Sequence, residues 1–98
     1  MTSNLNHIPH DPDTTILFEQ QGVFDDIPAC YQSWHLKNCH SNGISGESII
    51  FLKKDLKQHK IKHLIQKVKA SHLVQNPDQV TKKQKSDYLF INFNFKKS

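Results

Sequence analysis

Four residues that could bind a metal or act as nucleophiles lie close together in the sequence: Cys30, His35, Cys39 and His40. Thiolates and imidazoles are the usual ligands of zinc, and a cysteine beside a histidine can also perform nucleophilic catalysis. The spacing C-x4-H-x3-C-H lacks the C-x2-C pair of a structural zinc site. We therefore expect no metal, no cofactor and no catalytic residue. A metal or thiol site around residues 30–40 remains the weaker alternative.

A second group with chemical potential is the histidine pair His59 and His63, which would share one face of a helix. A zincin-type motif is excluded, because Lys60 stands where its glutamate should be. The surrounding lysines would repel a cation. A merely solvated helix face is the first interpretation of this pair, and among ligands an anion, such as a phosphate group, suits it better than a metal.

Seven lysines surround the histidine pair in the sequence: Lys53, Lys54, Lys57, Lys60, Lys62, Lys67 and Lys69. On a helix, Lys60 and Lys67 would flank one side of the histidine face, and Lys62 and Lys69 the other. The chain has no arginine, the usual reader of guanine, whereas lysine suffices for phosphate contact without sequence preference. Lys82, Lys83 and Lys85 could extend the patch. Binding should weaken with salt and strengthen below about pH 6.5, where imidazoles become charged.

Charge is distributed unevenly along the chain. Residues 1–47 carry six carboxylates and one lysine, a net charge of −5, whereas residues 48–98 carry twelve lysines and three carboxylates, a net charge of +9. One interpretation is that the two halves neutralise each other within the molecule. The other is that the basic half faces an acidic partner.

The stretch from Glu47 to Val74 is predicted to position the lysines. Its apolar run, Ile49 to Leu52, is typical of a strand covered on both faces. Asp55 has the character of a helix N-cap, and no glycine or proline interrupts the chain before Asn76-Pro77. The predicted helix has an apolar stripe for packing against a sheet: Ile61, Leu64, Ile65, Val68 and His72.

Two further strands and one further helix are predicted. Residues 14–19 and 87–95 are strand-like. In the latter, Tyr88, Phe90 and Asn92 share a face that becomes more polar toward its end. Asp25-Asp26 followed by Pro28 is typical of a helix start, so a helix is expected over about 26–38.

These elements predict an α/β or α+β fold. The expected architecture is a small two-layer sandwich of β-α-β-α-β order, with three or four strands and two helices on one face. Residues 1–13 are expected to be a disordered lead, 14–95 a single domain and 96–98 a tail. No apolar run approaches the roughly 20 residues of a membrane span, and no signal peptide is evident, so a soluble, cytoplasmic protein is expected.

The sequence as a whole predicts a non-enzymatic binding protein that contacts an acidic macromolecule. Nucleic-acid phosphates are the first candidate partner, bound through the seven lysines above with His59 and His63. The alternative is a protein-binding inhibitor, immunity or antitoxin-type module, which size and charge asymmetry fit equally well. Strand order and oligomeric state remain open.

Overall fold

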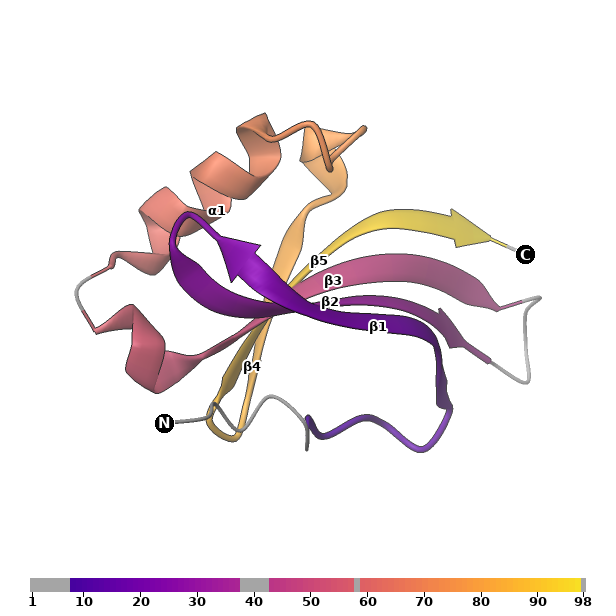
Figure 1. Cartoon of the computed structure of the whole chain (residues 1–98). Helices are drawn as coiled ribbons and strands as arrows, with labels where there is room; N and C mark the ends of the chain where they lie inside the picture. Colours follow the sequence, from indigo (N-terminus) through magenta and orange to yellow (C-terminus); the bar gives the residue numbers. More distant parts are fainter. Residues whose placement is uncertain (1–7, 38–42, 58, 98) are drawn as a thin grey trace.

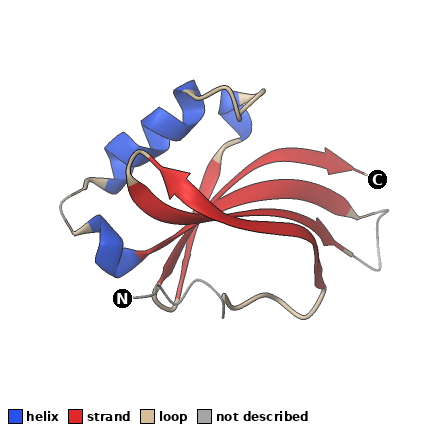
Figure 2. Cartoon of the chain, in the orientation of Figure 1, coloured by secondary structure: helices blue, strands red, loops and turns tan. Residues whose placement is uncertain are grey.

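A computed structural model describes residues 8–37, 43–57 and 59–97, except for the side chains of residues 95–97. Within these residues, five antiparallel strands form one sheet in the order β1-β2-β3-β5-β4. Strands account for most of the described chain (Figure 2). Their bounds are β1 Thr14–Phe24, β2 Ile27–Leu36, β3 Ile44–Leu52, β4 Thr81–Lys85 and β5 Tyr88–Lys97.

One α-helix and two short 3₁₀ helices connect β3 to β4. They are η1 (Lys53–Leu56), α1 (Ile61–Ala70) and η2 (Pro77–Gln79). The helix α1 lies over one face of the sheet, called here the helix face (Figure 1). The chain that leads into β1 runs along the other face, called the opposite face. None of the helices in the described part of the chain is long and apolar enough to cross a membrane.

The apolar run of β3 supplies both cores. Ile49 and Phe51 face the helix and pack with Leu64 and Val68 of α1. Ile50 faces away and packs in a smaller cluster with Cys30, Leu52, Tyr88, Phe90 and Ile8. Since neighbouring strand residues point to opposite faces, a strand buried on both sides needs apolar residues at every position. This part of the sequence prediction is confirmed.

The predicted β-α-β-α-β sandwich is wrong. In the described part of the chain, the sheet has five antiparallel strands rather than three or four, and one α-helix covers it rather than two. The main reason is the segment predicted as a helix over 26–38, because residues 27–36 form β2 at the centre of the β1–β2–β3 meander.

Asp25 and Asp26 explain why this segment resembles a helix start. Both residues have positive φ, 52° and 64°, and together they form the two-residue turn between β1 and β2. Two consecutive positive φ angles are typical of the type I′ hairpin turn, in which Asn-Gly and Asp-Gly are the common sequences. Two aspartates serve the same purpose here, so acids that suit a helix N-terminus instead mark a hairpin.

The central helix is shorter than predicted. Asp55 lies inside η1 and caps no helix, whereas α1 begins at Ile61 with Lys60 as an N-cap that makes no side-chain hydrogen bond. The helix ends six residues before Asn76-Pro77, where the Ser71 hydroxyl donates to the Val68 carbonyl at 2.7 Å. Between α1 and β5 the chain forms η2 and the edge strand β4.

The end segments also contact the sheet. The predicted lead of residues 1–13 lies outside the described residues up to position 7. From position 8 it lies against the sheet, with Ile8 only 7% exposed in the opposite-face core. At the other end, backbone pairing with β3 extends β5 to Lys97, into the predicted tail.

Candidate functional site

The amphipathic character of α1 directs its lysines to solvent. Leu64 and Val68 are buried against the sheet, and Ile61 and Ile65 are partly buried beside them. The polar side of α1 and the two residues before the helix are together called here the lysine face, which consists of His59, Lys60, Lys62, His63, Lys67 and Lys69, all exposed. The predicted apolar stripe is therefore confirmed for the four aliphatic residues, whereas His72 lies beyond the end of α1 and is exposed.

The two edges of the lysine face differ in charge environment. On one edge, the Lys67 ammonium lies 2.6 Å from the Asp25 carboxylate, which projects from the β1–β2 turn. On the other edge, Lys62 and Lys69 form no ion pair with any described residue. They are seven residues apart, so the helix repeat places them on the same side, about 10 Å apart along the axis.

The predicted histidine pair is only partly helical. His59 precedes α1 and bonds its backbone N–H to the Leu56 carbonyl at 2.9 Å, whereas His63 lies in the first turn. Both nevertheless line one open groove between the helix and the β1–β2 turn, together with Asp25 and Lys67. The groove thus mixes imidazole, ammonium and carboxylate groups.

The other lysines predicted for the site lie off the helix. Lys53 and Lys54 are in η1, and Lys57 follows it. Lys53 is half-buried, and the other two are exposed.

Lys83 and Lys85 do not extend the lysine face. They are on β4, opposite Phe90 and Tyr88 in the register, so they project from the opposite face of the sheet.

The ion pairs connect the acidic and basic halves of the chain. Lys67 pairs with Asp25, while Lys83 and Lys85 both pair with Asp11, at 3.3 and 3.1 Å. Three lysines therefore pair with two carboxylates of the acidic half, which offset two of the three positive charges. Eight lysines with described side chains form no such pair: Lys37, Lys53, Lys54, Lys57, Lys60, Lys62, Lys69 and Lys82.

Two of the candidate metal ligands point away from each other. Cys30 and His35 lie on β2 an odd number of residues apart, so they face opposite sides of the sheet. His35 shares a 2.9 Å hydrogen bond with the Ser45 hydroxyl. Cys39 and His40 lie outside the described residues. Among the residues that the structure places, His, Cys, Asp and Glu side chains form no group of three or more able to hold a metal.

The chemistry of Cys30 is suppressed by its surroundings. The thiol is fully buried, and burial, with the charge and hydrogen bond of Glu19 as secondary causes, raises its pKa to about 12. At neutral pH the group is a protonated thiol, whereas thiolates are the nucleophiles and metal ligands. Cys30 therefore functions as a small core residue.

A cavity on the opposite face is a feature that the sequence prediction missed. It has a volume of about 180 Å³ and lies between the sheet, the chain leading into β1, and β4. A row of polar cross-strand partners crosses the sheet, and its three middle members line the cavity: Glu19, Gln32, Ser48, Asn92 and Thr81, one from each strand. The increasing polarity along one face of the strand predicted over 87–95 was the one sequence signal for this row, because Asn92 follows Phe90 on that face.

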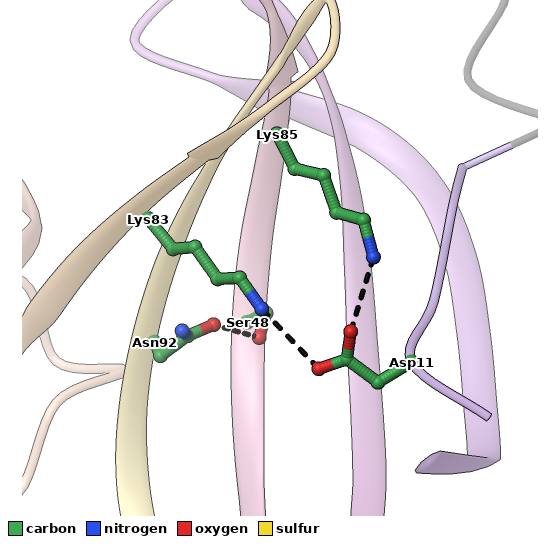
Figure 3. Close-up of polar contacts among 5 residues, drawn as sticks. All are labelled: Asp11, Ser48, Lys83, Lys85 and Asn92. Atoms are coloured by element: carbon green, nitrogen blue, oxygen red, sulfur yellow. Dashed lines mark hydrogen bonds and ion pairs between the residues drawn. The ribbon is translucent and has the colours of Figure 1, made fainter. Parts of the chain in front are cut away.

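The polar row is internally bonded and reaches the lining of the cavity. The Trp34 indole N–H donates to the Ser48 hydroxyl at 2.7 Å, and that hydroxyl donates to the Asn92 amide oxygen at 2.5 Å. The Gln32 amide donates to the Glu19 carboxylate at 2.5 Å. Figure 3 shows Lys83 and Lys85 reaching from β4 to Asp11 beside the Ser48–Asn92 pair.

Comparison with protein families, curated proteins and solved structures found no match to this chain.

Proposed function

We propose that this chain is a small, non-enzymatic, cytoplasmic binding protein whose lysine face contacts nucleic-acid phosphates. The observation that supports this proposal best is the pair Lys62 and Lys69, exposed on one side of α1 with no carboxylate partner among the described residues. Unneutralised surface ammonium groups attract polyanions and release their counterions on binding.

The spacing of the pair fits a phosphate backbone. Seven residues of helix span about 10 Å, so the two lysines can contact different phosphates of one duplex. Lysine makes point-charge contacts, and without arginine the face lacks the fork that reads guanine bidentately. We therefore expect weak sequence preference and strong dependence on salt.

The test is a fluorescence-anisotropy titration of a labelled random-sequence duplex across a salt series. Lys62→Gln with Lys69→Gln should lower affinity about tenfold near 0.1 M salt, because two phosphate contacts are lost. The slope of log affinity against log salt should become shallower by about 1.8.

Two further variants serve as controls. Lys37→Glu changes the net charge by the same two units, but lies at the end of β2 remote from the β1–β2 turn, so affinity should stay within about twofold. Asp25→Asn removes the partner of Lys67 and should tighten binding. Affinity that is independent of salt, or an equal loss in Lys37→Glu, would refute the proposal.

A second candidate function is the protein-binding module, an inhibitor, immunity protein or antitoxin. The edge strand β1 favours it, because Leu17, Phe18 and Val23 are each more than half exposed. Exposed apolar side chains on an edge strand are typical of surfaces that pair with another chain. A protein partner that survives nuclease treatment, and is lost on Phe18→Lys, would favour this function over nucleic-acid binding.

A further inference from the structure

The opposite face of the sheet contains polar groups where its neighbours are apolar. Gln32 and Ser48 are 3% and 2% exposed, yet the adjacent cross-strand row consists of Cys30, Ile50 and Phe90. Burying polar groups is unfavourable unless their hydrogen bonds are satisfied, and here they are satisfied by bonds within the row. Gln32, Ser48 and Asn92 of the row thereby give the lining of the cavity a polar part.

The cavity above the row has room for a ligand with a small ring. Its volume of about 180 Å³ is close to the roughly 150 Å³ of an engineered protein cavity that binds benzene. Trp34, Leu36 and Phe90 give it apolar walls, while Ser48 and Asn92 provide polar groups. Asn92 uses its amide oxygen for Ser48, and its Nδ2 group donates to no described residue. That group is available to a ligand.

The mouth of the cavity already holds a carboxylate. The two oxygens of Asp11 accept from Lys83 and Lys85, one each, at 3.3 and 3.1 Å (Figure 3). These hydrogen bonds, together with the charges of the lysines, hold the pKa of Asp11 below its ordinary value. Two ammonium groups that converge on one carboxylate form a receptor for that group, and here the occupant belongs to the chain itself.

We propose that this cavity binds a small organic carboxylate with an apolar body about the size of one six-membered ring. The ligand's carboxylate takes the place of Asp11 between Lys83 and Lys85, and its ring lies against Trp34 and Phe90. Asp11 precedes β1 and is half-exposed, so its side chain can turn outward without disturbing the sheet. This site is on the face away from α1, and it does not depend on nucleic-acid binding.

Trp34 makes the test direct, because it is the only tryptophan of the chain and lines the cavity. Its fluorescence is titrated with cyclohexanecarboxylate and benzoate, and with cyclohexylmethanol as the uncharged analogue. The two carboxylates should give a saturable change, and the alcohol should bind at least tenfold more weakly. Asp11→Asn, which removes the competing carboxylate, should tighten carboxylate binding about fivefold to tenfold.

Lys83→Gln with Lys85→Gln should weaken carboxylate binding at least tenfold. The matched control is Lys82→Glu, which changes the net charge equally on the same strand, but from the helix face. All three lysines are outside the core, and circular dichroism verifies that each variant folds. The proposal is overturned if neither carboxylate changes Trp34 fluorescence in the native protein and in Asp11→Asn. It is also overturned if the alcohol, or the double lysine variant, binds equally well.

Discussion

Individual residues carry the structural signals that are easiest to misread in this chain. Asp25 and Asp26 form a hairpin turn, yet acids before Ile27-Pro28 also match a helix start. Helix N-termini and type I′ turns both favour short polar side chains, but for different reasons. At a helix N-terminus the side-chain oxygen accepts a backbone hydrogen bond, whereas a type I′ turn requires residues that tolerate positive φ. The residue type alone therefore does not distinguish a hairpin turn from a helix N-terminus.

The positive φ angle of Asp26 leads to a testable prediction. Because its φ is 64°, glycine should relieve strain there and alanine should not. Asp26→Gly should raise the free energy of unfolding by about 0.5–1 kcal/mol, and Asp26→Ala should lower it by a similar amount. Urea denaturation of the two variants measures this difference. A more stable alanine variant would indicate that the residue lies in a helix.

Cys30 provides a second prediction. With the pKa raised to about 12 by burial, the folded thiol should resist iodoacetamide at pH 8, whereas the denatured protein should react readily. Because the folded state disfavours ionisation, this thiol's contribution to stability is complete below pH 9 and is lost as pH rises toward 12. Peptide mapping by mass spectrometry locates the modification. Equal labelling of Cys30 in both states would contradict its burial.

At the scale of elements, strands with a clear apolar pattern were predictable. The apolar run of β3 and the alternation of β5 both indicated strands, and both elements are strands. β2 was not predictable, because Ile27, Tyr31 and Trp34 fit a helical repeat, although Tyr31 and Trp34 lie on different faces of the strand. β4 was not predictable either, because its sequence TKKQK has no apolar pattern and is typical of a charged edge strand.

Some features of the candidate site could likewise be predicted from the sequence, and others could not. The stripe beneath α1 could be predicted because helical periodicity is local. The pairing of Lys67 with Asp25 could not, because it depends on a turn 42 residues away in the sequence. The cavity of Asp11, Lys83 and Lys85 depends on the strand order, which places β4 beside β5 and leads residues 8–13 beneath the sheet.

The arrangement of strands predicts how stability is distributed between centre and edge. Phe51 on β3 is fully buried and packs edge-to-face on Phe24, with ring centroids 6.3 Å apart. Phe51→Ala should lower the free energy of unfolding by about 3–5 kcal/mol. Phe18 on the edge strand β1 is 57% exposed, so Phe18→Ala should change the free energy of unfolding by less than about 0.5 kcal/mol. Equal losses in denaturant unfolding would contradict this sheet order.

At the scale of the molecule, the sheet separates two surfaces of different character. On the helix face, α1 presents lysines that the acidic half neutralises at Lys67 but not at Lys62 or Lys69. On the opposite face, Asp11 of the acidic half pairs with both Lys83 and Lys85 and offsets one of their two charges. The charge asymmetry of the sequence is therefore partly cancelled within the fold, and most of the described lysines without an ion pair lie in and around η1 and α1.

Amide chemical-shift mapping by NMR tests the central proposal most directly. A short random-sequence duplex is titrated into the isotope-labelled protein at low salt, and the shift changes are assigned residue by residue. Changes should be concentrated between residues 53 and 70, with the largest at Lys62 and Lys69, and should disappear as salt is raised. Shifts confined to β1 or to the Lys83–Lys85 edge, or no shifts at low salt, would contradict it.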